Sequence, residues 1–238
     1  MDEAERLGVP VPGWTPPRRP DWQRIEGRYV ALERLDPLRH AADLHAANRQ
    51  SDAIWDYLPY GPFADEAEYR AWAEGMAGRD DPWFVALIDA GTRRAAGVAS
   101  YLRIDPAAGS IEVGHINLAP ALQQTRAATE AMYLMMQWAF EAGYRRYEWK
   151  CNALNLPSRR AAERLGLSYE GLFRQAAVVK GRNRDTTWFA AIDADWPALE
   201  KAFDRWLDPA NFGVDGRQQE SLASLTRPAL VSRDPALV

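Results

Sequence analysis

The segment PALQQTRAATEAMYLMM, residues 120–136, begins a helix on which the arrangement of the whole chain depends. Pro120 ends the preceding element, Thr125 stands at a typical N-cap position, and apolar residues then recur at helical spacing. The first turn, residues 123–128, is small and polar and contains no carboxylate. Helix N-termini often carry Asp or Glu to complement their positive dipole. One explanation is that the negative partner of this helix is a bound anion.

The flanking sequence predicts strands and helices in a regular order. Strands are expected at 28–35, 83–89, 95–104, 110–118 and 144–151, with a long hairpin over 168–193 that turns near Gly181. Helices are expected at 38–50, 64–77, 125–142, 156–166 and 195–207. A meander of strands followed by a β-α-β crossover predicts one α/β (α+β) domain. Its mixed central sheet would have about seven strands, with helices on both faces.

Two terminal segments flank this domain, which we place at residues 23–207. Residues 1–22 are rich in proline and predict an extended arm. Residues 208–238 predict a polar tail that docks as a loop. Both segments are candidates for the contact surface of a homodimer.

The composition argues against several functional classes. The chain has 238 residues and a net charge of −4, so we expect binding neither to nucleic acid nor to an anionic membrane. No apolar run approaches the roughly 20 residues that cross a bilayer, and the acidic N-terminus lacks the features of a secretory signal. Cys151 is the only cysteine, which fits a reducing cytoplasm. We expect no metal site, because His40 and His45 are five residues apart and no Cys or His cluster accompanies them.

Positive charge is concentrated after the helix that begins at Thr125. Ten Lys or Arg residues stand against three acidic residues between Tyr144 and Arg184, although the whole chain is acidic. A basic field beside a helix N-terminus favours a phosphorylated ligand. A capped surface helix and a solvated basic hairpin would explain the same residues without a ligand, so both interpretations stay open. RNA binding is disfavoured, because no aromatic and basic sheet motif is present.

The segment CNALNLPSRRAAERLGLSYEG, residues 151–171, resembles the second signature of the GNAT acetyltransferase superfamily, in the branch of the Rim-type ribosomal-protein N-acetyltransferases. The match consists of Asn155, Ser158, Gly166 and the pair Glu170–Gly171. IEVGHINL (111–118) with the helix after it resembles the acyl-CoA signature, and residues 173–193 resemble the closing hairpin of the branch. The resemblance covers about residues 24–206.

One departure from the family pattern concerns the pyrophosphate turn. The pattern there is Arg-Gly-x-Gly, whereas this chain has Gln124 and Arg126 at the glycine positions. The departure bears on cofactor affinity more than on cofactor identity.

The resemblance implies a cofactor, acetyl-CoA or another acyl-CoA such as succinyl-CoA. Its pantetheine arm would lie where the fourth strand splays from the fifth, against the backbone of Ile116, Asn117 and Leu118. The residues implied to hold the pyrophosphate are Gln123, Gln124, Thr125, Arg126, Ala127, Ala128 and Thr129. Those implied near the thioester and the phosphates are Asn155, Ser158, Arg159 and Arg160.

The implied reaction is attack of a neutral amine on the thioester, which needs a proton acceptor for the amine and a proton donor for the thiolate. Glu112 is the candidate base, with a structural carboxylate paired to an arginine as the alternative. His115 is the competing base, and strand alternation places it on the face opposite Glu112 unless a bulge intervenes. Ser158 is the candidate acid, and Asn155 completes the expected catalytic set. We expect Cys151 to be a buried thiol and not a nucleophile.

The acceptor pocket implied by the resemblance lies between the first two helices, their connecting loop and the closing hairpin. Its expected residues are Trp55, Tyr57, Tyr60, Phe63, Trp83, His115, Lys180, Arg182 and Arg184. Aromatic and cationic side chains together suit a planar or anionic acceptor. We therefore expect an acyl-CoA-dependent N-acyltransferase acting on a small-molecule amine or amino-acyl compound. A peptide N-terminus is the alternative acceptor, and a catalytically silent acyl-CoA sensor is the alternative of another class.

Overall fold

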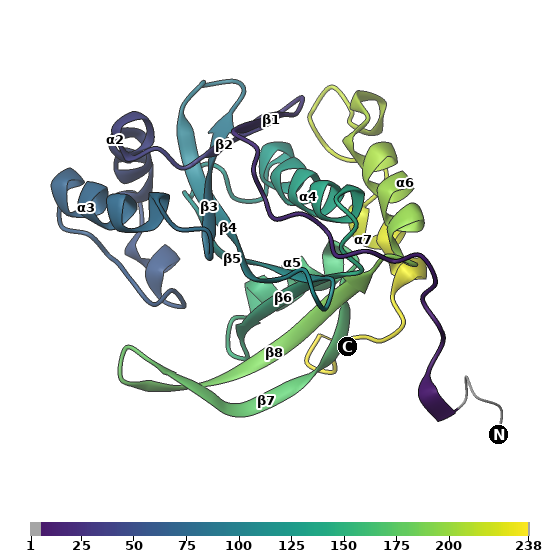
Figure 1. The fold of residues 1–238 in the computed structure, drawn as a ribbon. Coiled ribbons are helices and arrows are strands. Elements are labelled where there is room, and N and C mark those ends of the chain that lie inside the picture. The colour runs from purple at the N-terminus through teal and green to yellow at the C-terminus, as the bar shows by residue number, and fades with distance from the viewer. Residues whose placement is uncertain (1–5, 238) are drawn as a thin grey trace.

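A computed structural model describes residues 6–237 and shows one mixed sheet flanked by helices (Figure 1). The sheet has eight strands in the order β1-β2-β3-β4-β5-β6-β8-β7. The strands are β1 (Arg24–Glu26), β2 (Val30–Arg34), β3 (Trp83–Asp89), β4 (Ala95–Asp105), β5 (Ser110–Leu118), β6 (Arg146–Asn152), β7 (Ser168–Val179) and β8 (Arg182–Ile192). The strand that the sequence did not predict is β1, whose three residues are too few to show alternation.

Helices cover both faces of the sheet, as predicted. On one face lie α2 (Pro37–Asn48) and α3 (Glu66–Ala77), joined by a loop that contains the 3-10 helix η1 (Asp52–Trp55). On the other face lie α4 (Arg126–Glu141), α5 (Leu156–Arg164), α6 (Trp196–Leu207) and α7 (Leu222–Thr226). No helix within residues 6–237 combines the length and apolar character needed to cross a membrane.

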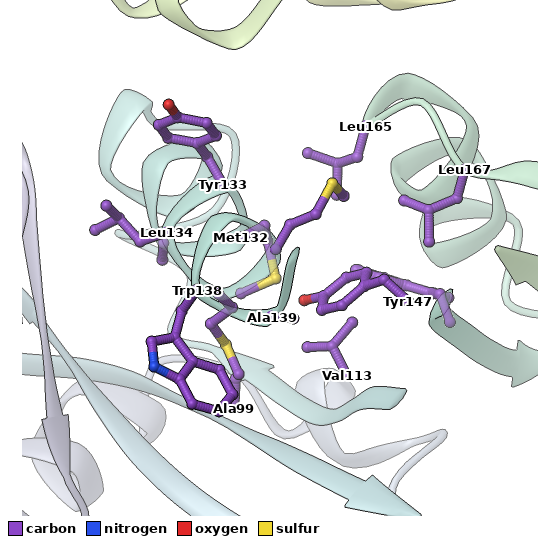
Figure 2. Close-up of a cluster of buried hydrophobic side chains, with 14 of the residues drawn as sticks. Ala99, Val113, Met132, Tyr133, Leu134, Trp138, Ala139, Tyr147, Leu165 and Leu167 are labelled. Atoms are coloured by element: carbon purple, nitrogen blue, oxygen red, sulfur yellow. The ribbon is translucent and has the colours of Figure 1, made fainter. Parts of the chain in front are cut away.

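Alternation along the strands divides the apolar side chains between the two faces. On β3, Val85 belongs to the core beneath α4, whereas Phe84 and Ala86 belong to the core beneath α2 and α3. Figure 2 shows the core around α4, in which Met132 and Ala139 face Val113 of β5 and Tyr147 of β6. A fully buried side chain of this size typically contributes about 1.5–3 kcal/mol to folding.

The helix α4 begins and ends at the residues that the sequence indicates. Thr125 is the N-cap, and its side chain accepts a hydrogen bond from the backbone N–H of Ala128 at 3.1 Å. The first turn contains no acidic residue. After Ala142, Gly143 has φ +98°, a left-handed conformation that glycine adopts without strain. Residues 119–125 form the turn that connects the end of β5 to the N-terminus of α4.

The sheet opens between β5 and β6, its parallel pair. The two strands pair only from Ser110 with Arg146 to Val113 with Trp149, although β5 continues to Leu118 and β6 to Asn152. The remaining strand neighbours are antiparallel. The splay predicted between the strands at 110–118 and 144–151, which are β5 and β6, is therefore confirmed. It leaves one edge of residues 114–118 in β5 without a partner strand.

The two terminal segments pack on the domain. In the described part of the arm, Trp22 packs edge-on against Trp83 (4.6 Å between ring centroids), and Arg19 donates to the carbonyl of Ile104 at 2.9 Å. The tail was expected to dock as a loop, but it contains two 3-10 helices, η2 (Pro209–Asn211) and η3 (Arg227–Ala229), with α7 between them. It is anchored by an ion pair between Arg159 and Asp234, both buried.

Candidate active site

The turn between β5 and α4 has free backbone N–H groups and a left-handed residue although it contains no glycine. Gln124 has φ +59°, the left-handed conformation that glycine usually supplies in such a turn. The backbone N–H of Thr129 donates to Thr125, but those of Gln124, Arg126 and Ala127 have no acceptor among residues 6–237. Between them, the Thr125 N–H donates to the carbonyl of Leu122 at 3.4 Å. Free N–H groups beside a left-handed residue are a feature of anion-binding nests. The backbone shape that the family pattern obtains from glycine is therefore present.

Two arginines lie at this helix terminus. The guanidinium of Arg126 lies over the rings of Tyr29 (4.8 Å) and Phe212 (4.6 Å). Arg164 of α5, which the sequence did not single out, donates to the Thr129 hydroxyl at 3.2 Å, and burial lowers its pKa. Gln123 donates from its side chain to the carbonyl of Leu118 at 3.0 Å and so closes the turn.

A bulge in β5 brings both candidate bases to one face of the sheet. Val98 pairs with Asn117 and Ser100 pairs with Gly114, so β5 has one more residue than β4 between these pairs. His115, at the bulge, has φ +51°. Because of this extra residue, His115 faces α2 and α3, the face that Glu112 also occupies. Simple alternation had placed the two on opposite faces, and the bulge is the exception that the sequence analysis allowed for.

His115 lies in an aromatic and cationic setting. Its ring stacks on Tyr60 (5.6 Å) and lies 5.1 Å from Phe84. Burial, together with the charges of Arg103 and Arg184, lowers the pKa of His115 to about 4. The imidazole is therefore uncharged at neutral pH. Its Nδ1 is buried and has no hydrogen-bond partner among the described residues.

Glu112 is a buried carboxylate whose two oxygens are already engaged. Arg103 donates to both of them, with Nε 2.6 Å from Oε2, and Lys150 Nζ lies 2.9 Å from Oε2. Lys150 also pairs with Glu148 at 2.8 Å and lies over the Trp188 ring. This geometry favours the structural interpretation of Glu112, because Arg103 and Lys150 already contact both of its carboxylate oxygens.

Asn155 and Ser158 lie beside the open edge of β6. Asn155 is the N-cap of α5, with Oδ1 accepting from the Ser158 N–H at 3.1 Å. The Ser158 hydroxyl accepts from the indole N–H of Trp149 at 3.0 Å, and its other hydrogen-bonding contact is with the Cys151 thiol. Cys151 is buried, and this burial raises the pKa of its thiol, as expected for a thiol that is not a nucleophile.

The two arginines after Ser158 differ in accessibility. Arg159 is buried, donates to Asp234 (2.7 Å from Nε) and also bonds the carbonyl of Ala153. Its guanidinium is committed to the tail, so the expected contact with cofactor phosphates does not fit this arrangement. Arg160 is exposed and has no ion-pair partner among residues 6–237.

The loop between α2 and α3 meets the tip of the β7–β8 hairpin. Lys180 donates to the carbonyl of Trp55 at 2.9 Å, and the Tyr57 hydroxyl donates to the carbonyl of Leu154 at 3.2 Å. Trp55 itself is buried, and Tyr60 packs against Trp72 with 4.6 Å between centroids. The α2–α3 loop, the β7–β8 hairpin and His115 therefore surround one region on the face of the sheet that α2 and α3 cover.

Trp83 is not part of this region, and its expected role in acceptor binding is wrong. Phe84 is the residue of β3 that faces His115, so alternation turns Trp83 to the opposite face, where Trp22 covers it. Arg182 is exposed at the hairpin turn. Arg184, two residues on, is half-buried and near enough to His115 to lower its pKa.

Several buried polar atoms in this region lack a partner within residues 6–237. They belong to Tyr60, Tyr69, Trp72, His115 and Asn117. Buried polar groups in proteins are normally satisfied by protein, water or ligand. The described residues contain no group of three or more His, Cys, Asp or Glu side chains that could hold a metal ion.

The fold thus combines a splayed parallel pair of strands with a helix that has free N–H groups at its N-terminus. Residues 30–168 match the family model described as acetyltransferase (GNAT) domain. The chain therefore belongs to the GNAT acetyltransferase family, whose members transfer an acyl group from CoA.

Solved structures agree with this assignment. A GCN5-related N-acetyltransferase from Brucella melitensis is 45% identical, with a TM-score of 0.89, over 91% of this chain and 100% of that one. A GNAT-family protein from Chromobacterium violaceum ATCC 12472 is 40% identical, with a TM-score of 0.76, over 80% of this chain and 96% of that one. The microcin C7 self-immunity acetyltransferase MccE, in complex with acetyl-CoA and AMP, shares the fold at 19% identity and a TM-score of 0.62, over 70% and 93%. A search of the curated proteins found no match.

Proposed function

We propose that this protein is an N-acetyltransferase that uses acetyl-CoA to acylate the primary amine of a small molecule or amino-acyl compound in a ternary complex. The observation that carries the proposal is the combination of the β5–β6 splay with the free N–H groups after Gln124. The splay offers an unpaired strand edge, and the helix terminus offers an anion site at its end.

The residues present fit acetyl-CoA in three respects. The open edge of β5 over residues 114–118 can pair with the amides of a pantetheine arm. The free N–H groups of Gln124, Arg126 and Ala127 suit a pyrophosphate, with Arg164 adding positive charge. Asn117 is buried with both side-chain polar atoms unpartnered, as expected beside a bound polar chain. That MccE was solved with acetyl-CoA supports this choice of cofactor in the shared fold.

When bound, acetyl-CoA supplies an activated acyl group, whose C–S bond breaks as the C–N bond to the amine forms. In our proposal, uncharged His115 accepts the proton that the amine releases during the attack. The Ser158 hydroxyl, held through its oxygen by Trp149, donates a hydrogen bond toward the departing sulfur. Strand N–H groups in residues 114–118 stabilise the carbonyl oxygen. Glu112 keeps Arg103 and Lys150 in place and takes no proton.

The closed arrangement around His115 supports a small acceptor. The bonds from Lys180 to Trp55 and from Tyr57 to Leu154 connect the rim of the region, and Tyr60 with Trp72 lines its wall. A peptide N-terminus, the acceptor of the Rim-type branch, is the second candidate. A groove of about 780 Å³ whose lining includes Arg19, Arg103, Lys150 and Trp188 favours it, because a chain could extend there.

The test is release of the CoA thiol from acetyl-CoA with a panel of small amines, amino acids and short peptides, using wild type and S158A. We expect turnover with at least one amine, and a fall in kcat of about 10- to 100-fold in S158A at unchanged affinity for acetyl-CoA. Binding of acetyl-CoA without turnover of any amine would favour the silent sensor. Wild-type kcat in S158A would remove Ser158 from the mechanism.

A further inference from the structure

Arg184 is a half-buried arginine that has no ion-pair partner among residues 6–237. It lies on β8 two residues before Thr186, whose pairing with Asn152 is the last between β8 and β6. Its Nε is buried and makes no hydrogen bond, and the side chain forms no ion pair with any residue from 6 to 237. Burial lowers the pKa of its guanidinium, which reflects the cost of a charge removed from water.

The acidic side chains near Arg184 are engaged by other cations. Arg103 and Arg184 each lower the pKa of His115, so both cations lie near the imidazole. Besides burial, the charges of Cys151, Arg103 and Glu112 act on the pKa of Arg184, and the Glu112 carboxylate is already shared by Arg103 and Lys150. Glu148 pairs with Lys150, and the charges of Glu148 and Asp81 act on Arg103.

Two other arginines that are buried or partly buried have hydrogen-bond acceptors. Arg159 is held by Asp234, and Arg34 by the carbonyls of Phe84, Ala77 and Arg79. An unpaired charge in a partly desolvated position is unfavourable, and a bound anion would remove that cost. The planar guanidinium matches a carboxylate in a bidentate arrangement.

We propose that Arg184 binds a carboxylate of the reacting molecules beside His115. This inference rests on the proposed function, because it places the carboxylate next to the transferred acyl group. The carboxylate has two chemical sources: the acyl chain of a dicarboxylic acyl-CoA, such as succinyl-CoA, or the acceptor itself, as in an amino acid. Both present the same group to the same guanidinium.

Calorimetric titration distinguishes the two sources without requiring turnover. The first pair of probes is acetyl-CoA and succinyl-CoA. The second pair, titrated with CoA present, is N-acetyl-L-phenylalanine and its amide, N-acetyl-L-phenylalaninamide. The proteins are wild type, R184Q, R184K and a control, R174Q, which removes an exposed arginine from β7 of the same hairpin.

We expect wild type and R174Q to bind the carboxylate member of one pair at least about tenfold more tightly than its neutral member, as for a charge-assisted hydrogen bond. R184Q should lose that preference, and R184K should keep part of it. Preference within the first pair assigns the acyl chain, and within the second the acceptor. Absence of a preference in both pairs, or a preference that survives in R184Q, overturns the inference. Acetyl-CoA binding by wild type and R184Q tests the proposed function separately.

Discussion

At the scale of single residues, Gln124 and His115 have a left-handed backbone conformation, which residues other than glycine rarely adopt. Their φ values are +59° and +51°, and each stands at one end of the segment assigned to the cofactor. Left-handed backbone costs roughly 1–2 kcal/mol in a non-glycine residue. Such strain persists only where the surroundings require it, and it is concentrated at functional sites. The left-handed backbone at these two positions is therefore retained although it lowers the stability of the fold.

Replacing Gln124 tests whether the backbone shape, and not the side chain, serves the site. Q124G should retain binding of acetyl-CoA and lose no more than about 0.5 kcal/mol of stability, because relief of strain offsets the greater freedom of glycine when unfolded. Q124V should lose roughly 1–2 kcal/mol, because a β-branched residue is disfavoured at positive φ. Urea unfolding and calorimetry measure both quantities. Full stability and full affinity in Q124V would contradict this reading of the turn.

At the scale of elements, most of the fold follows from local sequence. The strand at 110–118 has the predicted bounds and the helix that begins at residue 126 has the predicted N-cap, because alternation, the Thr125 cap and Gly143 are local signals. The face of the sheet toward which a given side chain points is less predictable. Trp83 was placed on the wrong face, since a tryptophan gives no sign of which phase of a strand it occupies. The bulge at His115 has no local signature, because it depends on pairing with β4.

The position of His115 at the β5 bulge predicts how kcat/KM depends on pH. Because the pKa of His115 is lowered to about 4, the imidazole is already uncharged above pH 5. The dependence of kcat/KM on pH should therefore follow the acceptor amine alone and rise about tenfold per unit from pH 6 to 8 for an alkyl amine. H115N should be slower, by about 10- to 100-fold, with the same slope.

The measurement is the initial rate of CoA release across that range, at subsaturating amine. An inflection near pH 6.5 in wild type that is absent from H115N would contradict the account, since it would mean that His115 titrates normally.

At the scale of the whole molecule, contacts between distant segments hold the site together. The tail reaches α5 through Asp234 and Arg159, which lie 75 residues apart and are both buried. Sequence alone did not pair them, because nothing local to Arg159 distinguishes a cofactor ligand from an anchor for the tail. The docking of the tail and the partner of Arg159 could be found only from the three-dimensional structure.

Breaking the tail anchor should destabilise the domain. D234N leaves Arg159 buried without its counter-charge and should cost about 3–5 kcal/mol. The control is R233Q, which removes the neighbouring, more exposed pair with Glu163 and should cost less than about 1 kcal/mol. Urea unfolding gives both values. Equal effects of the two substitutions would show that the buried pair is not an anchor.

Acid should destabilise the folded chain before its carboxylates titrate. Burial and the charge of Arg39 lower the pKa of His40 to about 4, although Nε2 lies 3.1 Å from Glu33. The neutral ring satisfies both contacts, since Nδ1 accepts from the Asp36 N–H at 3.1 Å. Between pH 6.5 and 5 the unfolded chain binds protons at His40 and His115 that the folded chain does not, so stability falls as pH falls.

The free energy of unfolding should therefore be lower at pH 5 than at pH 7. In H40Q, which cannot titrate at this position, the difference between the two pH values should shrink. A wild-type stability that is constant over this range, or higher at pH 5, would mean that the buried histidines are charged in the folded state.

The most direct test of the central claim is amide hydrogen exchange of the full chain, followed by mass spectrometry, with and without acetyl-CoA and with ATP as the control ligand. We expect acetyl-CoA to slow exchange in peptides covering residues 114–118 and 124–129, the open strand edge and the turn at the helix N-terminus. Peptides from residues 24–34 should be unaffected. Protection confined to other segments, or no protection by acetyl-CoA at all, would contradict the claim that the splay and the glycine-free turn hold the cofactor.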